Sequence, residues 1–182
     1  MHLKFGTSYQ ETADISLISK SYLVEKFHEW TDAGVIDKAF DIIRNRYVEL
    51  RYVQTQRAHM TTIIDGSHIK NRFGAEDIGY HLIKEEKSKQ ATKINIITDS
   101  TGVPLSLDTC SASCSDVSRL LLSVDNLPQK LDTNQIQTDL LGDKGYISSA
   151  YERSLRADKK IELITHKRRN MNNRNTHVQQ KK

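Results

Sequence analysis

Apolar residues in the first part of the chain recur at the spacing of an α-helix, from about Ile15 to Leu50. The segment "SYLVEKFHEWTDAG" carries this pattern and ends at Gly34, which is expected to stop the helix. The next segment, "VIDKAFDIIRNRYVEL", repeats it. The apolar positions concerned are Tyr22, Leu23, Phe27, Trp30, Val35, Ile36, Phe40, Ile43 and Tyr47. We expect a helical hairpin whose aromatic side chains form a core.

After residue 58 the pattern changes to short β-branched runs, which are typical of strands. The first run, "HMTTIIDGS", predicts a buried strand followed by a turn at Asp65 and Gly66. The stretch "TKINIITDSTGVPLSLDTCSA" predicts a hairpin. Its first strand covers residues 93–98, its turn is "DSTG", and its second strand begins near Val103.

Helices and strands then alternate along the chain. Ser115 is a good N-cap for a helix over "SDVSRLLLSVDNL", and Ser148 or Ser149 caps a helix over "SSAYERSLRADKK". The segments "IQTDLLGDKGY" and "IELITHKR" predict strands. This order of elements predicts a mixed α/β layer with parallel pairing in part of its sheet.

The composition suits a soluble globular protein. Of 182 residues, 37% are hydrophobic and 27% are charged, which favours one domain with a small helical appendage and excludes a wholly disordered chain. No apolar run reaches the length of a membrane span, and "MHLKFGTSYQ" has no signal core.

Cys110 and Cys114 are too few for a disulfide framework or a structural zinc site. We expect buried or incidental thiols in a reducing, cytoplasmic compartment.

Positive charge gathers at the end of the chain. The formal net charge is +4, and no acidic residue follows Glu162. The basic residues beyond it are Lys167, Arg168, Arg169, Arg174, Lys181 and Lys182. A basic end favours a polyanionic partner, first of all nucleic acid. A solvated tail explains the same charge without a partner.

Two aspartates share one sequence context. Asp65 and Asp143 each follow an apolar strand and precede a glycine turn. Ligands in open α/β sheets gather beyond the carboxyl ends of strands, so neighbouring strands would bring these carboxylates together. A hard divalent ion such as Mg²⁺ would neutralise their repulsion, and two such ions can clamp a phosphodiester during cleavage. The alternative is that each aspartate is only a turn residue.

Other acidic residues are weaker candidates for a metal site. Asp99 also ends a strand, but aspartate is common in hairpin turns, so no metal-binding role is needed to explain it. Asp116 lies beside a helix N-cap. Glu152 is expected to face solvent from the helix after Asp143, and Glu162 begins its strand, at the wrong end of a parallel sheet.

Six segments together resemble the DDE transposases of bacterial insertion sequences, a family with a ribonuclease-H-like catalytic core. "FHEWTDAGVIDKAFDII" resembles the family's N-terminal helices, and "IIDGSHIK" resembles its first catalytic block. "TKINIITDSTGVPLSL" and "SASCSDVSRL" resemble the stretch between the blocks, where a histidine–aspartate or asparagine–aspartate pair usually falls. "LLGDKGYISSAY" resembles the second block, and "IELITHKRRN" the strand and basic segment after it. Each segment is weak evidence alone, but they occur in the family's order and at sensible spacing.

The resemblance implies a role for each matching residue. Asp65 and Asp143 match the two catalytic aspartates, and both would hold divalent metal, Mg²⁺ with Mn²⁺ as a substitute. The positions expected near DNA are Lys93, Lys144, Tyr146, Lys167, Arg168 and Arg169. For Lys93, a lysine whose stem lies beside the core is the alternative.

The resemblance also implies a reaction and its partners. The reaction would be phosphodiester hydrolysis at the element ends, followed by strand transfer by the freed 3′-hydroxyl. The partner would be double-stranded DNA, both element ends and target, bound by a homodimer. A membrane and a small-molecule substrate are not expected, and the protein would be cytoplasmic and DNA-associated.

One family feature is missing from this sequence. The third carboxylate of the family is a glutamate beside arginine and tyrosine on a helix after the last strand. No such arrangement occurs between Arg168 and Lys182, so we expect a chain truncated before this glutamate. The stretch "AEDIGYHLIKEEKSKQ" is also acidic, whereas the family's sequence in this region is usually glycine-rich and basic.

The expected fold is α/β, a ribonuclease-H-like mixed sheet with flanking helices, preceded by a short helical segment. Residues 1–57 would be the helical segment, 58–170 the incomplete DDE core and 171–182 a basic tail. Two functions stay open: a DDE transposase, or an inactive remnant that binds only DNA or a full-length partner. An actin-like ATPase would need a second phosphate loop and an adenosine motif besides "IIDGS", and the sequence has neither.

Overall fold

The structure is a computed structural model that describes residues 8–53, 59–70, 77–80, 90–132 and 136–166. The chain forms two compact units, residues 1–46 and 47–182. The expected boundary at residue 57 falls within the second unit, outside the described residues, as does the whole of the expected basic tail. Within the described ranges, no helix is long and apolar enough to cross a membrane.

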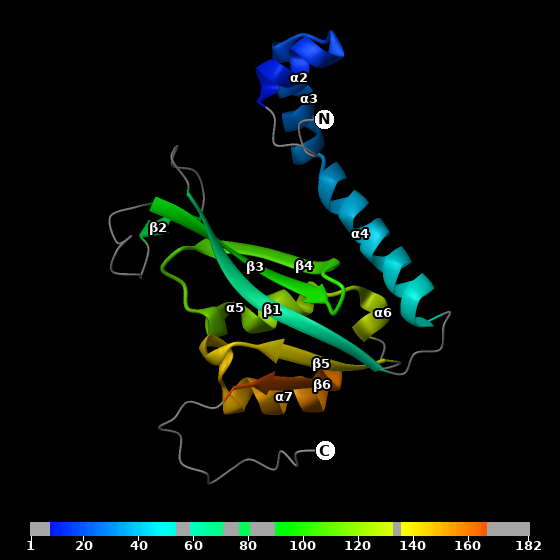
Figure 1. Cartoon of the computed structure of the whole chain (residues 1–182), viewed down its shortest axis with the longest axis vertical. Helices are drawn as coiled ribbons and strands as arrows, with labels where there is room; N and C mark the ends of the chain where they lie inside the picture. Colours follow the sequence, from blue (N-terminus) through cyan, green and yellow to red (C-terminus); the bar gives the residue numbers. More distant parts are fainter. Residues whose placement is uncertain (1–7, 54–58, 71–76, 81–89, 133–135, 167–182) are drawn as a thin grey trace. The chain divides into compact units, whose positions relative to one another are not determined.

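The described part of the first unit consists of three helices (Figure 1). They are α2 Tyr9–Ser16, α3 Lys20–Asp32 and α4 Val35–Val48, the last two residues of which belong to the second unit. Ser8 and Ser19 cap α2 and α3, because each side-chain oxygen accepts a backbone N–H of the first turn. Gly34 follows α3 with a φ of +63°, so the predicted helix stop is confirmed.

The aromatic residues of this unit do not form the expected core. Tyr22 and Trp30 are 49% and 51% exposed, and no residue of α3, which is described in full, is buried. Phe27 packs edge-to-face on Tyr9, so α3 packs against α2 and does not pair with α4 as a hairpin. The prediction was wrong because three short helices by themselves enclose too little volume to exclude water from large side chains.

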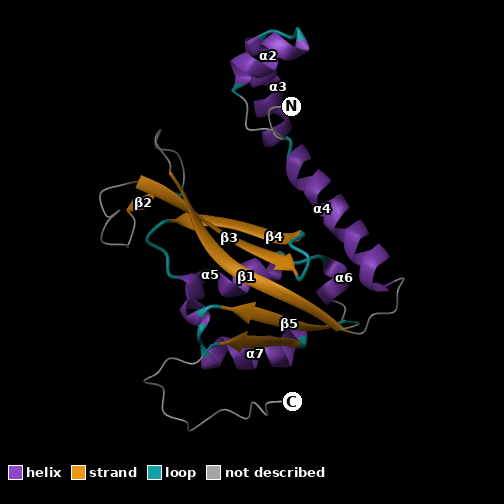
Figure 2. Ribbon diagram, in the orientation of Figure 1, coloured by secondary structure: helices purple, strands orange, loops and turns teal. Residues whose placement is uncertain are grey.

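A mixed β-sheet forms the centre of the second unit (Figures 1 and 2). Its strands are β1 His59–Lys70, β2 Gly79–Tyr80, β3 Gln90–Asp99, β4 Pro104–Ser111, β5 Gln137–Gly142 and β6 Ile161–Thr165. β1 pairs antiparallel with β3 on one side and parallel with β5 on the other. β4 and β2 pair with β3, and β6 extends the parallel half. The predicted mixed sheet is confirmed.

Helices follow the strands in the predicted order. They are α5 Asp116–Asp125, α6 Gln129–Asp132 and α7 Ser149–Lys159, with a short π-helix, η1 Glu49–Val53, and a 3₁₀ turn, η2 Lys144–Tyr146. Ser148 caps α7 by accepting the N–H of Tyr151. Ser115 occupies the N-cap position of α5, but its side chain makes no capping hydrogen bond.

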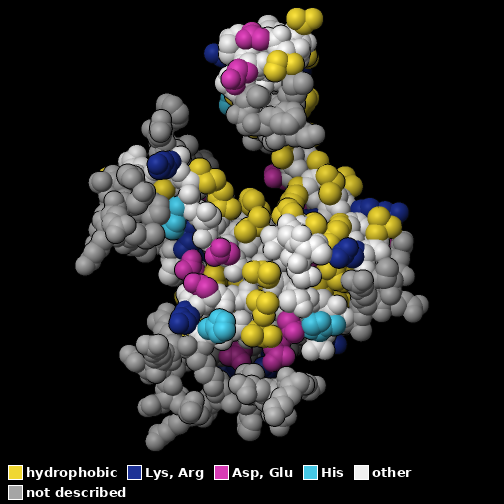
Figure 3. Space-filling model, in the orientation of Figure 1, with side chains coloured by type: hydrophobic (Ala, Val, Ile, Leu, Met, Phe, Trp, Pro, Cys, Tyr) yellow, Lys and Arg dark blue, Asp and Glu magenta, His cyan; other side chains and the backbone are white. Residues whose placement is uncertain are grey.

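The described helices of this unit cover one face of the sheet. On that face Ile64 and Leu140 join Leu120 of α5 and Leu155 of α7 in one buried cluster. Successive strand residues point to opposite faces, so Ile63 lies on the other face, where it is 42% exposed. Further exposed apolar residues of that open face are Ile69, Leu107 and Ile164. Figure 3 shows apolar side chains at the surface of this part of the molecule.

Replacing Ile64 by Val is expected to lower the free energy of unfolding by about 1 kcal/mol, because it removes a buried methylene. The same change at Ile63 is expected to cost less than about 0.5 kcal/mol, since that side chain already contacts water. Urea denaturation of both variants measures the difference. Equal losses would mean that the open face is covered in solution.

β1 runs past the turn that the sequence predicts. Instead of ending at Asp65, the strand continues to Lys70. Its antiparallel pairing with β3 continues as well, from Gly66 opposite Asn95 to the last residue of β1. The turn prediction was wrong because this pairing holds the glycine in extended backbone, so Asp65 lies inside a strand.

Asp99 anchors the turn at the end of β3. Its fully buried carboxylate accepts hydrogen bonds from the hydroxyls of Tyr47 and Tyr52, from the hydroxyl and backbone N–H of Thr101, and from the backbone N–H of Val103. Burial alone would raise the pKa of Asp99, but these hydrogen bonds lower it to about 2. The interpretation of Asp99 as a turn residue is confirmed.

Candidate active site

The end of the parallel pairing brings Asp65 and Asp143 together. The β1–β5 ladder ends with Ile64 opposite Gly142, and the next residue of each strand is one of these aspartates. Asp65 accepts the backbone N–H of the residue after it at 2.8 Å, and Asp143 accepts the N–H of Gly145 at 2.7 Å. Local backbone hydrogen bonds therefore orient both carboxylates.

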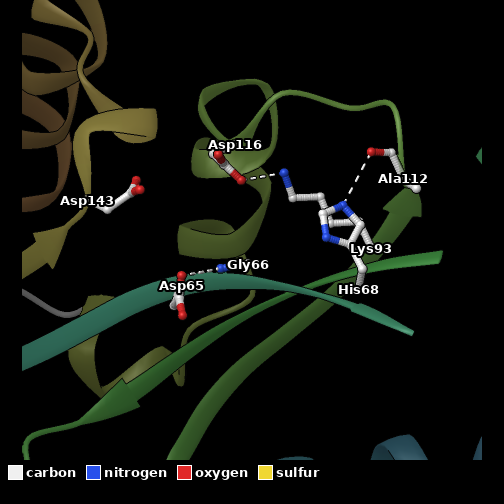
Figure 4. Close-up of a pocket in the computed structure, with 7 residues that line it drawn as sticks. All are labelled: Asp65, Gly66, His68, Lys93, Ala112, Asp116 and Asp143. Atoms are coloured by element: carbon white, nitrogen blue, oxygen red, sulfur yellow. Dashed lines mark hydrogen bonds and ion pairs between the residues drawn. The ribbon is translucent and has the colours of Figure 1, made fainter. Parts of the chain in front are cut away.

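Both aspartates line a pocket of about 320 Å³ (Figure 4). The other lining residues are Gly66, His68, Lys93, Ala112 and Asp116. In Figure 4 the carboxylate of Asp143 points toward the space between Asp65 and Asp116. The two aspartates thus meet at one site, while their roles in metal binding and catalysis stay predictions.

Asp116 is a third carboxylate of the pocket, and the sequence analysis gave it little weight. It is the first residue of α5, and the chain between β4 and α5 carries it to the pocket. Its side chain is about a third exposed and pairs with Lys93. A carboxylate in the first turn of a helix is common, so no local signal separates this one from an ordinary helix start.

Two glycines make room for Asp116. A Cβ on Gly145 would lie 2.5 Å from one oxygen of Asp116 and 2.9 Å from Asp143 Oδ1. A Cβ on Gly66 would lie 3.0 Å from the other oxygen of Asp116 and 2.9 Å from the side chain of Lys93. Neither glycine has a positive φ. Gly145 does lie in the 3₁₀ turn η2, as expected, whereas Gly66 lies in a strand; at both positions the missing side chain permits the close approach of Asp116.

Lys93 lies largely enclosed by protein. The residue is 5% exposed, and its ammonium group pairs with Asp116 and donates to the carbonyl of Cys114 at 3.1 Å. It lies on the helix-covered face of β3, opposite His68 of β1. The side chain thus lies beside the core, as the alternative interpretation expects, while DNA contact by Lys93 stays a prediction.

Tyr146 is also enclosed. It is 1% exposed and belongs to the buried apolar cluster, and its contact with DNA stays a prediction. Burial raises the pKa of Tyr146, and the negative charges of Asp116, Asp65 and Asp143 raise it further. The side chain therefore stays a neutral phenol beside the three carboxylates.

The remaining predicted residues lie in different places. Lys144 is exposed at the start of η2, beside the pocket, whereas Lys167, Arg168 and Arg169 lie outside the described residues. Glu152 and Glu162 both pair with Arg156 at the surface and do not line the pocket. Cys110 is buried, Cys114 is partly buried, and both are free thiols.

The donor chemistry of Asp65 and Asp143 fits a divalent metal ion. Carboxylate oxygens are hard ligands, and in the part of the chain that the structure describes no lysine or arginine pairs with either aspartate. No group of three His, Cys, Asp or Glu side chains arranged to hold an ion occurs among the described residues. The arrangement suits Mg²⁺, which one or two carboxylates can hold while water and substrate phosphates complete its shell.

A comparison with protein families identifies the class of this chain. The model of the transposase DDE domain matches residues 56–182, a range that includes both aspartates and the whole sheet. The chain therefore belongs to the transposase DDE domain family. Family membership and strand order together confirm the expected ribonuclease-H-like α/β fold. No curated protein sequence matches the chain.

Solved structures of other transposases are similar to this chain. A piggyBac transposase synaptic complex with hairpin DNA is 19% identical, with a TM-score of 0.46, over 67% of this chain and 26% of that one. A Mos1 transposase paired-end complex with the left transposon end is 11% identical, with a TM-score of 0.40, over 91% and 56%. A Mos1 mariner paired-end complex with Mn is 12% identical, with a TM-score of 0.38, over 88% and 54%. The chain thus spans between about a quarter and just over half of their lengths.

Proposed function

We propose that this chain is the catalytic core of an insertion-sequence transposase. It cleaves double-stranded DNA at the ends of the element and transfers the freed 3′ ends to target DNA. The observation that carries the proposal is the meeting of Asp65 and Asp143 in one pocket, within a chain whose family is the transposase DDE domain.

Asp65 and Asp143 would hold Mg²⁺, with Mn²⁺ as a substitute. When bound, the metal would polarise the phosphodiester and favour the ionised form of the attacking oxygen. The carboxylates, oriented by their backbone hydrogen bonds, set where the DNA phosphate must lie. The pocket, at about 320 Å³, is large enough for a phosphate group and its ion.

DNA binding would use basic side chains near Asp143 in sequence and beyond β6. Lys144 lies one residue after Asp143, and Lys167, Arg168 and Arg169 follow β6 in sequence. Neutralising phosphates with such residues gives sequence-independent, salt-dependent affinity. A homodimer that holds two element ends, associated with DNA in the cytoplasm, is part of this proposal.

A nicking assay tests the proposed function. The purified chain is incubated with a duplex that carries the element end, with Mg²⁺, with Mn²⁺ or with EDTA. Nicking that requires the metal supports a transposase core. Asp125→Asn, a change of an exposed carboxylate outside the pocket, is the matched control and should cleave like the unmodified chain.

The alternative is an inactive remnant that binds only DNA or a full-length partner. One observation favours it: the third carboxylate of the pocket, Asp116, is already paired with the ammonium group of Lys93. A gel-shift assay on the same duplex separates the two proposals. Binding without nicking under either metal would support the remnant, whereas metal-dependent nicking would exclude it.

A further inference from the structure

Lys93 places a positive charge inside a pocket whose other charged side chains are carboxylates. The residue projects from the middle of β3 and is 5% exposed. Its ammonium group has two acceptors, the carboxylate of Asp116 and the carbonyl of Cys114. Burying an ammonium group costs several kcal/mol unless it is paired, and Asp116 supplies the carboxylate that pairs with Lys93.

Asp116 faces two neighbours at once. Its Oδ1 lies near Gly66, as does the side chain of Lys93. Its Oδ2 lies near Gly145, as does Asp143 Oδ1. Without the ammonium group, Asp116 would be a third uncompensated carboxylate next to Asp143. Such a carboxylate would attract a divalent ion.

The charges of the pocket balance a single divalent ion. Three carboxylates and one ammonium group give its lining a formal charge of −2, with His68 neutral. Removing the ammonium group would make this charge −3, and removing Asp116 would make it −1. The affinity for a divalent cation should rise as this charge becomes more negative, because the charges lie at close range in a partly enclosed space.

We propose that Lys93 is a positioning residue of the metal site: it neutralises Asp116, withholds that carboxylate from the ion, and leaves Asp65 and Asp143 as the carboxylate ligands of one divalent ion. This inference rests on the proposed function, which places the ion at those two aspartates. It replaces DNA contact as the role of Lys93.

Titration of the full chain with Mn²⁺ tests the proposal, with free Mn²⁺ followed by its electron paramagnetic resonance signal. The unmodified chain should bind one ion. Lys93→Met should bind the first ion about tenfold more tightly or bind a second one, because Asp116 is released. Asp116→Asn should bind about tenfold more weakly, because the ammonium group is then unpaired beside the site.

The double variant Lys93→Met with Asp116→Asn separates electrostatics from damage to the fold. It has the same pocket charge as the unmodified chain, so its Mn²⁺ affinity should return to about the original value. A merely structural pair would weaken binding in all three variants, and that result would overturn the proposal. Unchanged binding in Lys93→Met would overturn it too. If Lys93→Met does not fold by circular dichroism, the recovery from Asp116→Asn to the double variant decides.

Failure of the proposed function gives a different pattern. Two results would contradict the assignment of the metal site to these aspartates. In the first, the unmodified chain binds no Mn²⁺; in the second, Asp65→Asn and Asp143→Asn bind Mn²⁺ as tightly as the unmodified chain. If those two variants lose binding but Lys93→Met does not gain it, only the role of Lys93 is wrong.

Discussion

Replacing Asp143 by Asn is expected to reduce metal-dependent nicking of element-end DNA by about 1000-fold or more. The change removes one of the two carboxylates that face the pocket without a protein cation, and with it several kcal/mol of metal-mediated stabilisation of the transition state. Asp65→Asn should have an effect of the same size. The rate of nicking at saturating Mg²⁺ measures both.

The fold should survive this change. The oxygen of an asparagine amide can still accept the N–H of Gly145, which Asp143 accepts at 2.7 Å. The thermal midpoint of Asp143→Asn should therefore stay near that of the unmodified chain, and Asp125→Asn should keep full nicking activity. A variant of Asp143 that cleaves normally would remove the proposed role of this carboxylate.

Replacing Asp99 by Ala is expected to destabilise the second unit by about 3–5 kcal/mol, because a buried charge at the centre of a hydrogen-bond network is lost. The hydroxyls of Tyr47 and Tyr52 and the N–H groups of the β3–β4 turn would lose their acceptor. Denaturant unfolding followed by circular dichroism measures the loss. A cost below about 1 kcal/mol would mean that water replaces the carboxylate readily.

Asp99 should also make stability depend on pH in an acidic window. Its pKa is lowered from the ordinary value of 3.8 to about 2 in the folded chain, so folding favours the ionised form. The contribution of about 2 kcal/mol is fully present above about pH 4 and is lost as pH falls toward 2. Unfolding free energies measured across this range test the sign. Asp99→Asn, which cannot titrate, should lose that part of the pH dependence.

Local sequence context was sufficient to predict the sheet and the two aspartates. Apolar runs and glycines mark the strands. The parallel pairing of β1 with β5 then brings Asp65 beside Asp143. The same context misplaced the end of β1, because pairing with β3 is a tertiary property that no local pattern shows.

Burial of polar groups was only partly predictable: a stem beside the core was one of two interpretations of Lys93, but nothing in the sequence marked Tyr146 as buried. Lys93 and Tyr146 look like ordinary polar residues near a catalytic motif, but both are enclosed once α5 packs on the sheet. Asp116 reaches the pocket only because the chain between β4 and α5 returns to β1. Tyr22 and Trp30 lie on a helix, as their spacing predicts. Whether such side chains are buried depends on how much protein surrounds them, and here they are exposed.

The close approach of Asp116 to Gly66 and Gly145 links three positions that are far apart in the chain. A side chain at either glycine position would crowd this carboxylate, together with Lys93 at position 66 and Asp143 at position 145, so a smaller residue at position 116 would relieve part of the crowding. Mutations at these positions are therefore expected to be tolerated in combination rather than singly. In diverging descendants of this sequence, the three positions should covary as one group.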